Sequence, residues 1–239
     1  MTSSFQGLDH KPGDDTVYAN WNYGMCRLLI PYVLHTSWFR DVEKLATRKQ
    51  LEATTAEIYT AFVPDRILTP AGATQNRTRP PQNPTTANFA YLYDFRDADA
   101  EGIMPDRRLD IGSGGWAMSA KTYGKFLTAL FDGALVFTNV RLNGVSVNAV
   151  DTMKSKRLGM FTRTGTGGDR YYVHRGANSW PAGKNKRVGG KSIWMHFPKN
   201  NITAVIQINS DQNDIHAMGV ERDQLLQEAY DEVYTDKTP

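Results

Sequence analysis

Residues 12–24, PGDDTVYANWNYG, place a turn and a short polar segment directly before an apolar run that extends from Met25 to Leu34. Tyr18 and Asn20 lie two positions apart just before the expected helix, so their polar ends can enter one cleft. A tyrosine phenol whose pKa is lowered can carry a proton, and an asparagine amide can hold a substrate carbonyl or a neighbouring side chain. The same spacing fits a structural interpretation, in which Tyr18 is a partly buried aromatic residue and Asn20 caps the helix. On spacing alone, the structural interpretation is the more frequent one.

The composition is that of an ordinary globular protein. The chain has 239 residues, of which 40% are hydrophobic and 22% charged, enough for one large or two small domains with a real core. The formal net charge is only +3, from 28 basic and 25 acidic residues, so we expect no nucleic-acid partner. The densest basic run, residues 183–191, is interpreted first as a solvated loop and second as an anion-binding loop.

Membrane and targeting signals are weak. No segment approaches 18 uncharged apolar residues, so we expect no membrane span. Residues 1–10 lack the basic and apolar regions of a signal peptide. Either the protein is intracellular or an N-terminal part has been removed, and the compartment is left open.

Cofactor signals are also weak. The single cysteine, Cys26, excludes an intramolecular disulfide and is expected to be a small core residue. The five histidines are scattered without close His/Cys pairing, so no metal site is predicted. The glycine-rich residues 165–168 lack the Lys-Ser/Thr pair that follows a phosphate loop, and no cofactor is expected.

Hydrophobic patterns predict helices first and strands later. Residues 21–39 read as largely buried helix with a break at Pro31, and residues 41–69 as a further helical region. Residues 74–110 are irregular, and the segment 111–131 enters a helix that Ser119 caps.

The last third of the chain reads as strands with a closing helix. The four expected strands are sequential and antiparallel, and a helix over residues 220–235 follows them. These strands are residues 158–162, 170–175, 191–197 and 202–209. The prediction is an α+β fold, a helical region followed by an antiparallel sheet with a closing C-terminal helix. We expect a helical and loop region over residues 1–110 and an α/β region over 111–239.

Several segments resemble one known family. Tyr18, Asn20 and Tyr23 fall where the serine β-lactamases and penicillin-binding-protein-like hydrolases carry a Tyr-x-Asn motif before a helix. Class C β-lactamases, D-Ala-D-Ala carboxypeptidases and related esterases belong to that family. Residues 64–73 and 112–121 resemble further family segments in the same order. The resemblance implies an incomplete β-lactamase/transpeptidase-like fold, with a short helix over residues 145–153.

His174-Arg175-Gly176 follows an aromatic strand and resembles the family's Lys-Thr-Gly or His-x-Gly. The resemblance implies that this strand lines the active site, with His174 as its basic residue and Gly176 giving access. The backbone N–H of Ala177 would then supply part of an oxyanion hole. It also implies Tyr18 as proton carrier and Asn20 as a substrate-positioning residue, for a small-molecule or peptide amide or ester. Taken alone, His174 fits a strand-end residue exposed to water better than a site residue.

The expected nucleophile is missing. The family uses Ser-x-x-Lys, yet no serine of this chain has a lysine three residues later. Family members place that motif before Tyr-x-Asn, and only 17 residues precede Tyr18. We therefore expect the C-terminal two-thirds of a complete enzyme, with an upstream segment or a second chain completing the sheet. The alternatives are a non-catalytic relative that acts as a binding or scaffold module, and an unrelated α+β binding protein.

Overall fold

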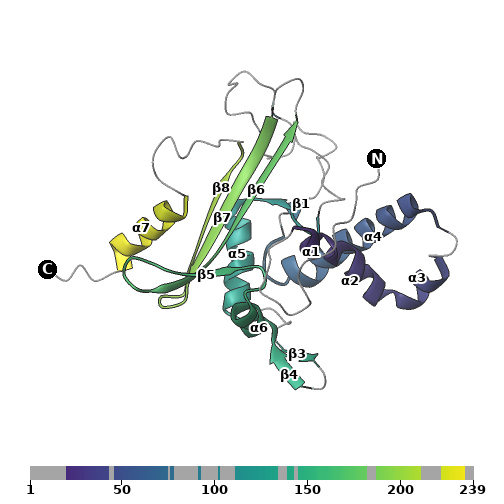
Figure 1. Cartoon of the computed structure of the whole chain (residues 1–239), viewed down its shortest axis with the longest axis horizontal. Coiled ribbons are helices and arrows are strands. Elements are labelled where there is room, and N and C mark those ends of the chain that lie inside the picture. The colour runs from purple at the N-terminus through teal and green to yellow at the C-terminus, as the bar shows by residue number, and fades with distance from the viewer. Residues whose placement is uncertain are drawn as a thin grey trace, which may run out of the picture.

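The computed structural model describes residues 20–42, 46–74, 76–77, 91–92, 102, 111–133, 139–142, 145–181, 187–210 and 222–234. Figure 1 shows a central antiparallel sheet with α7 on one side and α5 on the other, and with α1–α4 beyond α5. This arrangement confirms the predicted α+β class. The expected division between residues 110 and 111 stays a prediction, and Tyr18 lies outside the described residues.

The N-terminal part is a group of helices. They are α1 (Asn20–Gly24), α2 (Cys26–Leu34), α3 (Thr36–Val42) and α4 (Arg48–Val63), which continues into the π-helical turn η1 (Pro64–Leu68). Their buried core is small, and it reaches into the segment before α5. Its buried members are Tyr59, Val63, Leu68, Ala73 and Ile111.

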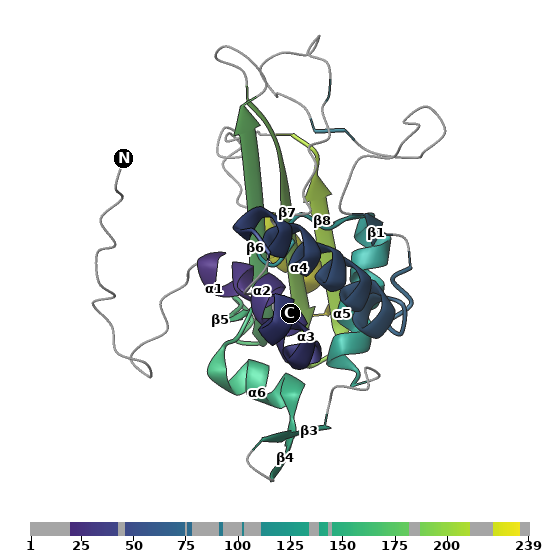
Figure 2. The same ribbon diagram turned by 90° about the vertical axis from the view of Figure 1, so that its right-hand side faces the viewer.

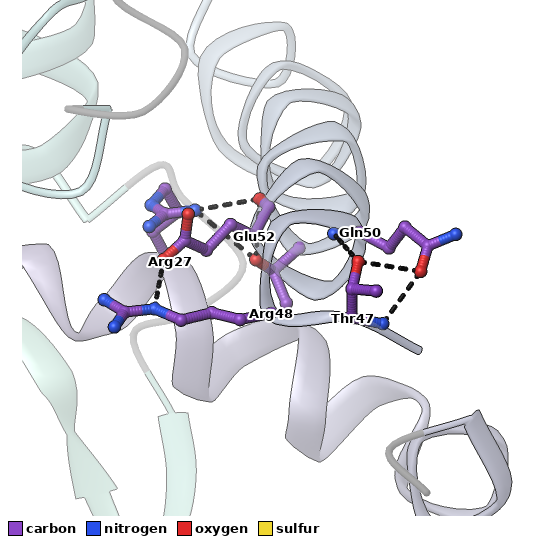
Figure 3. A network of polar contacts seen from close by, with 6 residues as sticks. Arg27, Thr47, Arg48, Gln50 and Glu52 are labelled. Atoms are coloured by element: carbon purple, nitrogen blue, oxygen red, sulfur yellow. Dashed lines mark hydrogen bonds and ion pairs between the residues drawn. The ribbon is translucent and has the colours of Figure 1, made fainter. Parts of the chain in front are cut away.

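Polar contacts start α4 and attach it to α2 (Figure 3). The side-chain hydroxyl of Thr47 accepts a hydrogen bond from the backbone N–H of Gln50 at 3.3 Å, and the Gln50 side chain accepts one from the backbone N–H of Thr47 at 2.8 Å. This reciprocal pair satisfies two donors that a helix start leaves open. Arg27 of α2 donates to the Glu52 carbonyl at 3.1 Å and the Thr55 hydroxyl at 3.4 Å, both on α4.

Two helix predictions were wrong in detail. The breaks fall not at Pro31 but at Met25, between α1 and α2, and at His35, whose φ of −130° ends α2. Pro31 is fully buried, so packing of its ring offsets the backbone hydrogen bond that it cannot donate. The helical region expected over 41–69 is divided, because α3 ends at Val42 and the Thr47 cap starts a new helix.

The middle of the chain contains two short antiparallel pairings and two helices. The short strands β1 (Asn76–Arg77) and β2 (Ala117–Met118) pair antiparallel, and α5 (Ala120–Phe131) follows. Ser119 caps α5 as predicted, since its hydroxyl accepts a hydrogen bond from the backbone N–H of Thr122 at 3.1 Å.

The helix expected over residues 145–153 was wrong in its first half. Residues 145–148 form β4 (Val145–Asn148), which pairs with β3 (Asn139–Leu142), and only then does α6 (Ala149–Lys156) begin. The two β-branched valines of β4 alternate with polar residues, a pattern that favours a strand. The Asn148 side chain accepts hydrogen bonds from two backbone N–H groups of the first turn and so starts α6.

The main sheet has the order β5-β6-β7-β8, and all neighbours are antiparallel. Its strands are β5 (Phe161–Thr164), β6 (Arg170–Pro181), β7 (Arg187–Phe197) and β8 (Ile202–Ile208), and α7 (Arg222–Tyr234) follows. The predicted strand order and closing helix are confirmed. The β6–β7 pair extends further than predicted, to Pro181↔Arg187. The loop expected over residues 183–191 is therefore wrong from Arg187 onward.

Both faces of the sheet are packed. Phe197 and Tyr230 of α7 stack at 3.8 Å between ring centroids on one face, within a cluster that includes Ile193 and Met195. On the other face, Trp194 of β7 packs with Leu127 of α5. We call the second face the α5 face. Figure 2, turned by 90°, shows α1–α4 in front of the sheet.

Candidate functional site

Strand β6 presents alternate residues to the α5 face of the sheet. His174 pairs with Trp194, Gly176 with Ser192, and Asn178 with Gly190. Paired residues of antiparallel strands share a face, and Trp194 packs on α5. His174, Gly176 and Asn178 therefore share the α5 face, and alternation places Ala177 on the opposite one.

One backbone edge of this stretch has no strand beside it in the part of the chain that the structure describes. The β5–β6 pairing ends at Phe161↔Val173. Beyond it, residues 174–181 pair with β7 alone among the described strands. Such an edge can bind an extended substrate through backbone hydrogen bonds. Ala177, the expected oxyanion donor, belongs to this stretch.

The glycine-rich turn, residues 112–115, contacts both α1 and this strand. A Cβ atom added to Gly112 would lie 2.6 Å from the Tyr23 carbonyl oxygen and 2.9 Å from that of Gly24, so the turn packs directly against the end of α1. A Cβ added to Gly114 would lie 3.4 Å from the side-chain nitrogen of Asn178 on β6. The turn thus touches two segments that are far apart in the sequence.

The turn is held in place at both ends. Ile111 is buried in the helical core, and the Trp116 indole donates a hydrogen bond to the Ile111 carbonyl at 3.1 Å. Gly115 adopts a φ of +85°, which favours glycine. Asn20, the first residue of α1, is exposed. The structure therefore brings the helix of Asn20, the glycine-rich turn and the strand of His174 into one region.

His174 is half-buried and neutral at pH 7. Its ring stacks on Phe161 with 5.9 Å between ring centroids and 18° between planes. Burial lowers the pKa of His174, and a hydrogen bond to the backbone of Arg175 opposes that shift. A neutral imidazole accepts or donates one hydrogen bond at each nitrogen, and it can take up a proton.

Tyr123 of α5 is unsuited to proton transfer at neutral pH. Burial raises the pKa of Tyr123 to about 12, although a hydrogen bond involving Trp194 acts in the opposite direction. The phenol therefore stays protonated at neutral pH.

Ser192 is a polar residue of this region that the sequence did not indicate. Its hydroxyl lies 2.7 Å from the position that a Cβ on Gly176 would take. Asn178 was missed as well, although alternation from His174 places it on the same face and could have found it. Ser192 could not be found in this way, because its place beside Gly176 depends on the register between two strands.

Metal and membrane signals are absent from the described part of the chain. Within it, no group of three His, Cys, Asp or Glu residues could hold a metal ion. None of the helices described there is both long and apolar enough to cross a membrane.

Comparison with known proteins gives one match. The model of a family described as Beta-lactamase matches residues 4–228. No curated protein and no solved structure matches the chain. The family match spans α1, the glycine-rich turn and β6, the three segments that the structure brings together.

Proposed function

The chain belongs to the beta-lactamase family, and from this premise we propose that it is the C-terminal part of a serine hydrolase that acts by acyl transfer on an amide or an ester. The proposal is supported most by the glycine-rich turn, because Gly112 packs on α1 while Gly114 approaches Asn178 of β6. The turn thereby holds α1 and the uncovered stretch of β6 close together, as a site shared between them would need.

In the proposed reaction, a serine hydroxyl attacks the substrate carbonyl and forms an acyl-enzyme. Tyr18 takes up the serine proton and delivers it to the leaving amine or alcohol, and water then hydrolyses the acyl ester, which releases the acid and regenerates the serine. Ala177 donates its backbone N–H to the developing oxyanion, Asn20 positions the substrate, and His174 lines the pocket beside the accessible Gly176. We propose that the serine belongs to a Ser-x-x-Lys motif on an upstream segment or a second chain.

Exposed apolar residues along α2 and at its N-cap support the proposal that another segment covers this helix. Met25, Leu29 and Val33 follow one another at intervals of four, so they share one helix face. They are 43%, 54% and 77% exposed, against the prediction that this region is largely buried. Among the described strands, β8 pairs only with β7, so it also offers an edge.

A second candidate function is a non-catalytic relative that binds a ligand in the same cleft. The absence of Ser-x-x-Lys from the sequence favours it. Such a module would bind a substrate-like molecule tightly and would not turn it over.

Covalent labelling with a fluorophosphonate and a fluorescent penicillin tests the proposal. The expected result is no adduct on this chain alone and a stoichiometric adduct once a Ser-x-x-Lys segment is supplied. The matched control is the same segment with its serine changed to alanine. Absence of labelling in every combination would favour the binding module. An adduct mapped to a serine of this chain would show that the nucleophile lies in this chain and not on another segment.

A further inference from the structure

Two polar side chains stand beside Gly176 on the α5 face of the sheet. Ser192 of β7 is the register partner of Gly176, and Asn178 lies two residues further along β6. The Ser192 hydroxyl occupies the space over Gly176 that a side chain there would need. The Asn178 amide lies under Gly114 of the glycine-rich turn. The two groups thus flank one glycine on one face.

Both groups have hydrogen-bonding capacity left for a ligand. Asn178 is exposed and Ser192 is partly exposed. Neither side chain makes a hydrogen bond to any residue that the structure describes. A hydroxyl and a primary amide each offer both a donor and an acceptor.

The strand residues next to Gly176 on the α5 face carry no charge, and Lys154, a cation on that face, lies over the ring of Tyr172, four positions before Gly176 on β6. His174 is the titratable residue of β6 next to Gly176 on the α5 face, and it is uncharged at pH 7. Arg175 and Lys191 are the neighbouring basic residues, and alternation places both on the opposite face. A carboxylate would find no cation on the α5 face beside Gly176, whereas an uncharged group with its own donor and acceptor would be matched.

We propose that Ser192 and Asn178 form a specificity subsite for a neutral carboxamide group of the substrate. The inference rests on the proposed hydrolase function and deepens it. The carboxamide oxygen accepts from the Ser192 hydroxyl or the Asn178 amide, and the carboxamide N–H donates to the remaining acceptor. Because Gly176 has no side chain, it leaves its space to the Ser192 hydroxyl, which is part of the subsite.

Three p-nitrophenyl esters of nearly equal shape test the subsite: the succinamate, the hemisuccinate and the 4-methylpentanoate. They end in a carboxamide, a carboxylate and an isopropyl group. The enzyme, assembled with its nucleophile-bearing segment, is expected to show its lowest KM for the succinamate. Ser192→Ala and Asn178→Leu should each raise that KM about fivefold, as the loss of one neutral hydrogen bond does, and leave the KM of the 4-methylpentanoate unchanged. Ser37→Ala removes an exposed hydroxyl on α3 and serves as the control.

The outcomes separate the subsite from the hydrolase. If Ser192→Ala and Asn178→Leu change the KM of all three esters equally, or change none of them, the subsite is overturned and the hydrolase proposal stands. If no ester is hydrolysed, the proposed function fails, and ligand-observed NMR with succinamide decides the subsite. Binding that Ser192→Ala weakens about fivefold supports it, and no binding, or binding that the variant leaves unchanged, overturns it.

Discussion

Gly112→Ala is predicted to destabilise the protein by separating the glycine-rich turn from α1. The new Cβ would lie 2.6 Å from the Tyr23 carbonyl oxygen, 2.9 Å from the Gly24 carbonyl oxygen and 3.0 Å from the Gly24 Cα. All three are backbone atoms, so no flexible side chain can move aside. Overpacking of this kind costs about 1–3 kcal/mol. Because the same turn approaches β6 at Gly114, the shift should also disturb the candidate site.

Gly124→Ala is the matched control for this prediction. It makes the same chemical change inside α5, where the nearest contact of the new Cβ would be 3.9 Å from a Val205 methyl group. Alanine is the better helix former, so this variant should gain about 0.5–1 kcal/mol.

Urea denaturation of wild type and both variants measures the difference. For a urea m-value of about 2 kcal/mol/M, a loss of about 2 kcal/mol moves the midpoint down by about 1 M. The two variants should move in opposite directions. If Gly112→Ala were as stable as the wild type, the close packing of the turn on α1 would be refuted.

Three further predictions concern the sheet and the start of α4. Burial, together with repulsion from Lys154, lowers the pKa of His196 to about 4. Below pH 6.5 the imidazole therefore becomes protonated in the unfolded chain while it stays neutral in the folded chain. The contribution of His196 to the free energy of unfolding should be complete above pH 6.5 and should fall by about 2–3 kcal/mol by pH 4.5. Urea denaturation at both pH values should show a smaller loss of stability for His196→Gln than for the wild type. Gly176→Ala places a Cβ 2.7 Å from the Ser192 hydroxyl oxygen, so adding Ser192→Ala should recover stability measured by thermal unfolding, and two additive effects would contradict the contact. Thr47→Ala removes the reciprocal cap with Gln50 and should cost about 1 kcal/mol in urea, whereas an unchanged midpoint would show that the cap contributes nothing.

Local features of the fold could be predicted from the sequence because their signals lie within a few residues. The helix cap at Ser119 depends on one side chain and the backbone three residues on, and it was predicted correctly. The strands around Val173 and Ile193 show their alternating pattern in the sequence, and so does the closing helix. Where two local signals compete, the prediction failed, as at Pro31 and at the start of β4.

The candidate site was predictable only in part. His174 and Gly176 stand out as a motif after an aromatic strand, and the structure places them on the strand whose edge is uncovered by described strands. Their roles stay predictions, as do those of Asn20 and Ala177. Ser192 gave no signal, because nothing near it in the sequence indicates what lies across the strand.

The sequence by itself determined the α+β class, the order of the strands, the cap at Ser119 and the family, since each of these is written in periodicity or in short motifs. The tertiary structure alone decided which residues meet. The contact of Gly112 with Tyr23, the approach of Gly114 to Asn178 and the pairing of Gly176 with Ser192 join segments distant in the chain. The physical reason is that strand register and close backbone packing arise from the whole assembly of helices and sheet, and no local pattern specifies them.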